Sequence, residues 1–443
     1  MTKRKKLIVF GVVILVCVMI CATAIAMNVS KVKGDEYPDR GLPVVEIDLS
    51  GVSLDEINGG DKDDRYRGNI LSIYNNGETV KYDGVELKGR GNATWAWDKR
   101  PYQIKFEQKT DVLGMGRARK WYLLANYRDE TNLRTETAFY LEAMLGMEPA
   151  MEGRFVELYM DGDYQGLYYL TQAVEVSKNV VNLNSPLGVL VELDNIYGWD
   201  EKFYKTGNGD VLTIKDAADK DRADEAMEGF LTEYNELELA LQAGNYARVA
   251  ELIDVESWAK YYLLSEFTVD PDAYWTSFYM YKDGPEDKIH AGPGWDYDMA
   301  LANRNWGNWL GEQLYSPTET MVRRNELTPD LWLARGGAEE EFVASNTIST
   351  IVYEMMEMPE FQTEVRRIYT ERMAGRESEL VMRMKNMAGM IREAAVADGE
   401  KWVRDIKLDA ATESLIDWVK ARYQFMDQIY GDGVTRPVEV LTL

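Results

Sequence analysis

Apolar and polar residues alternate along much of the chain between Val44 and Leu193. In Tyr102–Phe106 the apolar side chains alternate with Gln103 and Lys105, which is the period of a half-buried strand. Turn pairs such as Asn76-Gly77 lie between these runs, as hairpins require. The predicted strands are Val44–Leu49, Asn69–Tyr74, Val80–Lys88, Tyr102–Phe106, Trp121–Ala125, Arg154–Met160, Gly166–Val174 and Leu187–Leu193.

Helical periodicity takes over in the second half. One helix, from about Glu130 to Leu145, interrupts the strands and is followed by Gly146 as a stop signal. Later predicted helices are Asp221–Gln242, Val255–Phe267, Glu339–Met356, Phe361–Met390 and Ala410–Tyr430. One hairpin, Ser277–Tyr281 with Lys288–Trp295, lies among them. The pattern predicts an α+β protein with a strand-rich N-lobe (44–193) and a helical C-lobe (194–435), and ligands favour the space between such lobes.

The N-terminus carries an uncharged run from Leu7 to Met27, long enough to span a bilayer as a helix. Four cations precede it, which predicts a single-pass anchor with a cytoplasmic N-terminus and all later residues outside the cytoplasm. The alternative is a cleaved signal peptide and a secreted protein, because small residues end the run. Residues 28–43 are polar with several Gly and Pro, and we interpret them as a linker.

Charge and residue scarcity narrow the chemistry. The 443 residues include 75 acidic and 50 basic side chains, a net charge of −25, which argues against nucleic acid as a partner and against binding to anionic lipid. His290 is the single histidine, and Cys17 and Cys21 both lie in the N-terminal apolar run. Multi-histidine metal sites, cysteine zinc sites and cysteine nucleophiles are therefore excluded for the remaining chain.

Two carboxylate pairs are candidates for metal binding. Asp296 and Asp298 are two residues apart, so in extended chain both point to one side and could grip one hard cation. Asp270 and Asp272 form a second such pair. A solvated turn is the plainer interpretation of either motif taken alone.

A glycine-rich segment supplies a candidate for phosphate binding. Gly89 and Gly91 flank Arg90, and glycine lets the backbone approach a phosphate closely. Lys99, Arg100 and Lys105 add positive charge nearby. The alternative is a hairpin whose cations pair with surface carboxylates.

The ordered set of these motifs resembles the CotH kinase family. Five segments of this chain carry the resemblance. They are Gly-Arg-Gly-Asn-Ala-Thr-Trp from Gly89, Arg100–Phe106, Leu123–Asp129, Asp161–Thr171 and Gly294–Leu301. The order of the motifs carries the resemblance, which runs from about Val44 to Asn303.

The resemblance implies a protein-kinase-like fold that binds ATP with Mg²⁺ or Mn²⁺ and phosphorylates serine of a surface or coat protein. Asp272 would be the catalytic residue that accepts the hydroxyl proton. Asp296 and Asp298 would bind metal. Arg90 and Lys105 would bind the ATP phosphates. Ser277 stands five residues after Asp272, where kinases carry a metal-binding asparagine, and a hydroxyl is a weaker ligand.

Further assignments also come from the resemblance. The helix from about Glu130 would supply an acidic partner for Lys105; Glu136 and Glu142 both qualify, and our predicted nucleotide site includes Glu142. Thr135 and Ala302 replace the Asn and Gly that the family often has.

Two other functions fit parts of the sequence. A non-catalytic surface module that binds protein or glycan could use tryptophans such as Trp95 and Trp97. A glycosidase would need two suitably spaced carboxylates, but it leaves the Gly-Arg-Gly segment and Lys105 unexplained.

Overall fold

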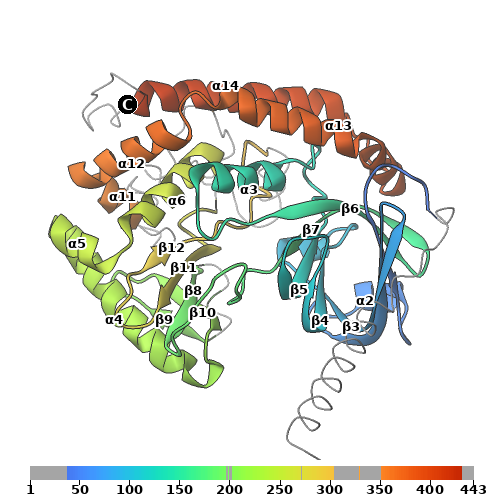
Figure 1. Ribbon diagram of the computed structural model, residues 1–443, viewed down its shortest axis with the longest axis horizontal. Coiled ribbons are helices and arrows are strands. Elements are labelled where there is room, and N and C mark those ends of the chain that lie inside the picture. The colour runs from blue at the N-terminus through green and yellow to red at the C-terminus, as the bar shows by residue number, and fades with distance from the viewer. Residues whose placement is uncertain are drawn as a thin grey trace, which may run out of the picture.

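The computed structural model describes residues 37–195, 198, 202–270, 272–303, 329 and 351–431. Its N-terminal part is a closed barrel in the order β1-β2-β3-β4-β5-β7-β6 (Figure 1, blue to teal). The strands are β1 (Val44–Asp48), β2 (Tyr66–Asn75), β3 (Glu78–Gly89), β4 (Tyr102–Asp111), β5 (Arg117–Leu124), β6 (Gly153–Met160) and β7 (Asp163–Gln172). The seven predicted strands of this region are thus confirmed, with shifted ends.

The alternating pattern explains how the barrel closes. In β4, Tyr102, Ile104 and Phe106 point into the barrel core, so Gln103 and Lys105 lie on the outer face. Antiparallel pairing joins neighbouring strands except at β1 and β6, which pair in parallel and complete the circle. A short helix, α2 (Leu54–Gly59), begins at a Ser53–Glu56 capping box.

A second sheet follows in the order β12-β11-β8-β10-β9 (Figure 1, green to yellow). Its strands are β8 (Gly188–Leu193), β9 (Phe203–Lys205), β10 (Val211–Ala217), β11 (Phe278–Asp283) and β12 (His290–Ala291). The predicted hairpin is confirmed as β11 and β12, whereas β9 and β10 were not predicted. β8, predicted as the end of the N-lobe, pairs with β10 and β11 and so belongs to this sheet.

Helices pack on the second sheet and, at β7, on the barrel. They are α3 (Arg134–Leu145), α4 (Ala223–Gln242), α5 (Tyr246–Leu252), α6 (Val255–Thr268), α11 (Ile351–Met356), α12 (Pro359–Arg372), α13 (Glu377–Lys401) and α14 (Leu408–Tyr430). The strand-rich N-terminal part and the helical C-terminal part agree with the predicted α+β class. The first two thirds of the predicted helix Glu339–Met356 lie outside the described residues, and the remainder is α11.

Two predicted helix boundaries were wrong. The helix predicted over Phe361–Met390 is split into α12 and α13, because the chain turns through Gly375 in the left-handed conformation (φ 74°). The helix predicted from Glu130 begins only at Arg134. Before it, the Asp129 carboxylate accepts hydrogen bonds from the backbone N–H groups of Thr131 and Arg134, which holds the segment in a turn.

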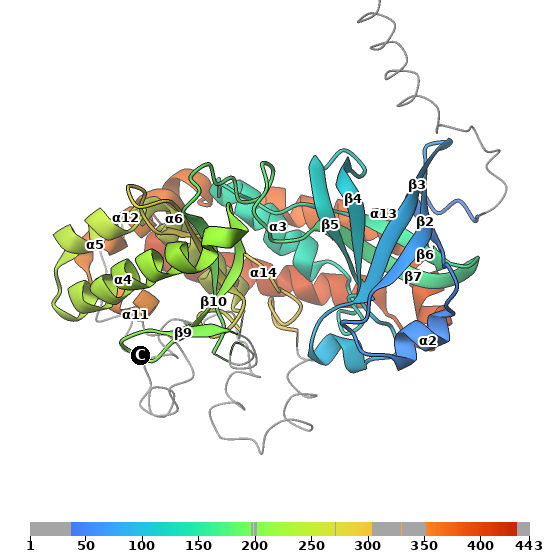
Figure 2. The same ribbon diagram turned by 90° about the horizontal axis from the view of Figure 1, so that it is seen from below.

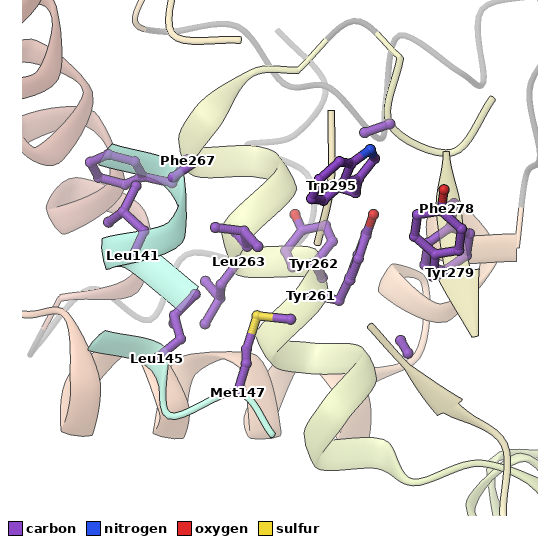
Figure 3. Packing of buried hydrophobic residues seen from close by; sticks show 14 of the residues in the cluster. Leu141, Leu145, Met147, Tyr261, Tyr262, Leu263, Phe267, Phe278, Tyr279 and Trp295 are labelled. Atoms are coloured by element: carbon purple, nitrogen blue, oxygen red, sulfur yellow. The ribbon is translucent and has the colours of Figure 1, made fainter. Parts of the chain in front are cut away.

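The largest core joins α3 and α6 to the second sheet. Figure 3 shows Leu141 and Leu145 from α3 packed near Tyr261 and Leu263 from α6. Trp295, from the segment after β12, lies in the same cluster. This packing fixes the end of α6 and the segment after β12 relative to one another, and both carry candidate site residues.

A buried ion pair joins the barrel to the helical tail. Lys99 Nζ lies 2.6 Å from Asp398 Oδ1 of α13, and neither side chain is exposed. Asp398 also pairs with Arg404 and accepts a hydrogen bond from Leu167 N in β7. Figures 1 and 2 show α13 and α14 running along both parts of the molecule, and α13 packs on β7. Burial lowers the pKa of Lys99 to about 8, which Asp398 partly opposes.

The end of the predicted linker is packed on the barrel. Arg40 pairs with the buried Glu157 at 2.6 Å, and the Tyr37 hydroxyl donates to Glu46. Within the described ranges no helix is sufficiently long and apolar for a membrane span. The predicted anchor, Leu7–Met27, lies outside these ranges.

We expect Lys99→Met to lower the free energy of unfolding by about 3 kcal/mol, because Asp398 would stay buried with only Arg404 as a cationic partner. The matched control is Lys202→Met, since Lys202 pairs with Asp224 at 2.5 Å but both side chains are more than 60% exposed. Urea unfolding measures both. Equal midpoints for the two variants would contradict the structural role of the buried pair.

Candidate functional site

The segment after β12 carries the Asp-Tyr-Asp motif with its side chains on alternate sides. Trp295 and Tyr297 are buried in the large core, whereas Asp296 and Asp298 keep partial exposure. The Tyr297 hydroxyl donates a hydrogen bond to the buried Glu142 of α3 at 3.2 Å, which anchors the motif to the core. The two aspartates therefore face the same side, as their spacing predicted.

Asp296 lies among groups of both charges. The Ser277 hydroxyl donates to Asp296 Oδ2 at 3.4 Å. Desolvation raises the pKa of Asp296, and Asp194 adds to this effect, while Arg90, Ser277 and Lys215 oppose it. The site thus brings Asp296 together with two of the predicted residues, Ser277 and Arg90.

Asp298 is the most strongly perturbed carboxylate of the motif. Desolvation raises its pKa well above the ordinary value, and repulsion from Asp296, Asp272 and Asp270 raises it further. Arg90 acts in the opposite direction. The structure therefore brings both predicted carboxylate pairs into one electrostatic group.

Asp270 and Asp272 occupy a tight turn at the end of α6. The backbone N–H of Asp272 donates to Asp270 Oδ1 at 3.2 Å. The carbonyl of Asp272 accepts from the N–H groups of Trp275 and Thr276, which closes the turn toward β11. Asp270 is buried and Asp272 is partly exposed. Asp272 is thus the more accessible of the two.

Backbone strain is concentrated around these aspartates. Among the described residues twelve other than glycine have positive φ, and half of them fall between 269 and 302. They are Val269, Tyr274, Ser277, Asp296, Leu301 and Ala302. Residues other than Gly, Asn and Asp adopt this conformation at a cost that surrounding structure must offset, and such strain gathers at functional sites.

Arg90 faces the carboxylates from the barrel. Its guanidinium lies 4.2 Å from the ring centroid of Tyr122 in β5 and 5.7 Å from that of Trp295. The backbone N–H of Arg90 donates to the Pro101 carbonyl. The Gly-Arg-Gly segment therefore presents its cation on the side of Asp296 and Asp298, in accordance with a phosphate-binding role.

Lys105, like Tyr122, lies on the outer face of the barrel, but its partner there is Glu86 and not a carboxylate of the Asp-Tyr-Asp motif. Its Nζ lies 4.0 Å from Glu86 Oε1, and Lys120 stands opposite it across β4 and β5. Glu142 is fully buried and accepts hydrogen bonds from Met151 N and Tyr297 Oη. Lys105 and Glu142 are therefore not brought together as a pair.

The other candidate from α3 is also engaged away from Lys105. Glu136 binds Arg383 of α13 and accepts from the Tyr169 hydroxyl. Burial raises the pKa of Glu142 well above its ordinary value, which favours a neutral carboxyl. Both glutamates of α3 thus serve contacts within the core or with the tail.

Residues that sequence reasoning missed lie on the second sheet. Glu192 and Lys215 form an ion pair of 2.8 Å, and the Tyr279 hydroxyl donates to Glu192 at 3.0 Å. The available signal was a glutamate inside the apolar run Leu187–Leu193, since a charged residue in a buried strand needs a partner.

The aromatic residues near the Gly-Arg-Gly segment are used for packing. Trp97 is buried against Tyr127 and Met299, and Arg128 lies over its ring. His290 stacks on Tyr281 in the β11–β12 hairpin.

The carboxylates have the chemistry of a divalent cation site. Desolvated acids that repel one another are stabilised by Mg²⁺ or Mn²⁺, which favour oxygen ligands. In the described part of the chain no three His, Cys, Asp or Glu side chains converge closely enough to hold a metal ion by themselves. Magnesium commonly uses one or two carboxylates together with substrate phosphates, so the pair Asp296 and Asp298 with Ser277 fits that mode.

The fold combines a strand barrel, a second sheet and a helical tail, and its clustered carboxylates lie after α6 and after β12. The family model described as CotH kinase protein matches residues 87–426, so the chain belongs to the CotH kinase family and is kinase-like at that level. The match includes every predicted site residue. No curated protein matches the chain.

We expect Asp298→Asn to stabilise the metal-free protein at pH 7.5 by about 1 kcal/mol or more, because it removes a charge that three carboxylates repel. A raised folded-state pKa means that the folded protein binds this proton more tightly than the unfolded chain. The advantage of the variant should therefore shrink as pH falls through the raised pKa toward the ordinary value of 3.8.

Thermal unfolding with and without Mg²⁺ measures both effects. Mg²⁺ should raise the melting temperature of the wild type but not that of Asp298→Asn. Asp405→Asn is the control, because Asp405 is 85% exposed. A variant less stable than wild type at pH 7.5, with an unchanged response to Mg²⁺, would contradict the proposed repulsion.

Proposed function

We propose that the protein is an ATP-dependent protein kinase that phosphorylates serine side chains, with Mg²⁺ or Mn²⁺ as the required metal. The observation that carries the proposal is the electrostatic grouping of Asp272, Asp296 and Asp298 opposite Arg90. Phosphoryl transfer requires positioning and charge neutralisation more than covalent chemistry by the protein. A site built from carboxylates, a hydroxyl and cations meets that requirement.

Each residue has a defined role in the proposal. Asp272 accepts the proton of the serine hydroxyl as its oxygen attacks the γ-phosphorus and the bond to ADP breaks. Asp296, Asp298 and Ser277 hold the metal, which neutralises phosphate charge when bound. Arg90 binds the phosphates, and Lys105 contributes charge from the same face of the barrel.

The setting of the reaction is also part of the proposal. The apolar run Leu7–Met27 would anchor the chain in the membrane with its N-terminus in the cytoplasm, and the kinase domain would act outside the cytoplasm on a surface or spore coat protein. Without the four N-terminal cations the net charge is −25 − 4 = −29. Such a surface favours a substrate with basic residues near its serine.

Asp272→Ala and Asp296→Ala should each lower the rate of phosphate transfer by at least about 100-fold, because one removes the proton acceptor and the other a metal ligand. Transfer of the γ-phosphate of radiolabelled ATP to a serine-containing basic protein, with Mn²⁺ or Mg²⁺, measures the rate. Asp405→Ala serves as the exposed control. Wild-type rates of phosphate transfer in both Asp272→Ala and Asp296→Ala would refute the proposed kinase activity of this site. If the wild type neither transfers phosphate nor gains thermal stability with ATP and metal, the function is that of a non-catalytic surface module.

Arg90→Met should raise the KM for ATP roughly tenfold or more, because it removes a charged donor to the phosphates. Arg90→Lys should recover only part of this loss, since lysine lacks the planar group that stacks on Tyr122. Initial rates at varied ATP concentration give KM and kcat. An unchanged KM in Arg90→Met would show that Arg90 serves only to pack Tyr122 and Trp295.

A further inference from the structure

Lys215 occupies an irregular position at the centre of the second sheet. β10 pairs with β8 through Ile214 and Val191, and then through Asp216 and Leu190, so Lys215 has no partner in that register. This is a β-bulge, which redirects a side chain and is common beside active sites. The Lys215 side chain is 32% exposed, so it is partly accessible from solvent.

Glu192 and Tyr279 hold Lys215 in place. Lys215 Nζ lies 2.8 Å from Glu192 Oε2, while the other carboxylate oxygen of Glu192 accepts from the Tyr279 hydroxyl at 3.0 Å. Lys215 Nζ also lies 5.1 Å from the ring centroid of Tyr279. Because both oxygens of Glu192 are engaged, the carboxylate fixes the ammonium position. An ammonium has three N–H donors, and the hydrogen bond to Glu192 uses one of them, so donor capacity remains for an anion.

The fixed ammonium faces the proposed site. Tyr279 pairs with Glu192 across β11 and β8, and Ser277, two residues before Tyr279, donates a hydrogen bond to Asp296 Oδ2 at 3.4 Å. The pKa shifts agree with this placement, since Lys215 lowers the pKa of Asp296 and Tyr122 of the barrel helps to raise the pKa of Lys215. The guanidinium of Arg90 packs against the ring of the same residue, Tyr122. Two cations, one from each sheet, therefore stand near Asp296 with Tyr122 close to both.

We propose that Lys215 binds the phosphate groups of the nucleotide, and that Glu192 is the residue that positions its ammonium. The inference rests on the proposed function and assigns to the second sheet a contact that the family resemblance gives to Lys105. Lys105 lies on the barrel 4.0 Å from Glu86, a carboxylate that it shares with Arg65 and Arg67, so it is held less closely than Lys215, which lies 2.8 Å from Glu192. A preorganised cation loses less freedom on binding an anion than a mobile one.

Binding of ATP in the presence of Mg²⁺, measured by calorimetry on the full chain, tests this assignment. Lys215→Met should weaken binding by about 10- to 100-fold, the usual effect of removing a charged donor. Lys215→Arg should retain more affinity than Lys215→Met. Lys202→Met, on an exposed ion pair, should bind ATP as the wild type does. A larger loss for Lys105→Met than for Lys215→Met would overturn the proposal in favour of Lys105.

Two further variants separate binding from folding. Lys215→Met leaves Glu192 without its cation, so the double variant Lys215→Met/Glu192→Gln should recover the wild-type melting temperature but not ATP affinity. Glu192→Gln alone should raise KM for ATP several-fold with little change in kcat, because it loosens the cation without removing it. Recovery of ATP affinity in the double variant would reduce the pair to a structural role.

The same titrations distinguish this inference from the proposed function. A wild type that binds no ATP with Mg²⁺ refutes the nucleotide site as a whole. A wild type that binds ATP, together with a Lys215→Met variant of equal affinity, leaves the kinase standing and refutes Lys215 alone.

Discussion

Asp298 loses hydration on burial while Asp296, Asp272 and Asp270 repel it, and Arg90 is the cation that opposes this repulsion. Such an arrangement is costly in the absence of a ligand, because desolvated like charges have little to offset their interaction. A bound divalent cation, with phosphates that accompany it, would offset this cost. The remaining features of the structure can be understood as the means of holding these carboxylates in place.

The scaffold brings together segments that are far apart in the sequence. The end of α6 carries Asp272, the segment after β12 carries Asp296 and Asp298, and the barrel contributes Arg90. The core shown in Figure 3 joins α3, α6 and the segment of Trp295. The segments that carry Asp272 and the Asp296–Asp298 pair are therefore packed as one body. The buried pair of Lys99 and Asp398 ties the barrel to the tail that covers it. Rigid packing lets the protein maintain strained conformations at Val269 and Ser277.

Local sequence patterns predicted much of the fold. Alternating or continuous apolar runs identified every barrel strand, because each strand buries one face in the barrel core, and β6 and β7 are buried on both faces. The start of α3 at Arg134 could not be predicted from periodicity, because side-chain hydrogen bonds of Asp129 hold the preceding residues in a turn. β9 has three residues, too few for a periodic signal.

The site was predictable where its chemistry is local. The spacing of Asp296 and Asp298 is enough to place both on one side, and Gly-Arg-Gly marks a cation on a flexible backbone. Lys215 and Glu192 belong to different strands, and their pairing depends on sheet order and on a bulge that leaves no clear local pattern. The pairing of Lys105 with a glutamate of α3 came from resemblance alone, and the packing of Glu142 and Glu136 elsewhere could be found only from the structure.

Binding of Mn²⁺ followed by electron paramagnetic resonance tests the central claim, that these carboxylates form a metal and nucleotide site, most directly. Free Mn²⁺ gives a strong signal that weakens when the ion is bound, so full-length protein can be titrated with and without ATP. The account predicts that ATP greatly increases Mn²⁺ binding by the wild type and that Asp296→Asn abolishes this increase. A wild-type protein that leaves the Mn²⁺ signal unchanged beyond the effect of ATP alone would contradict it.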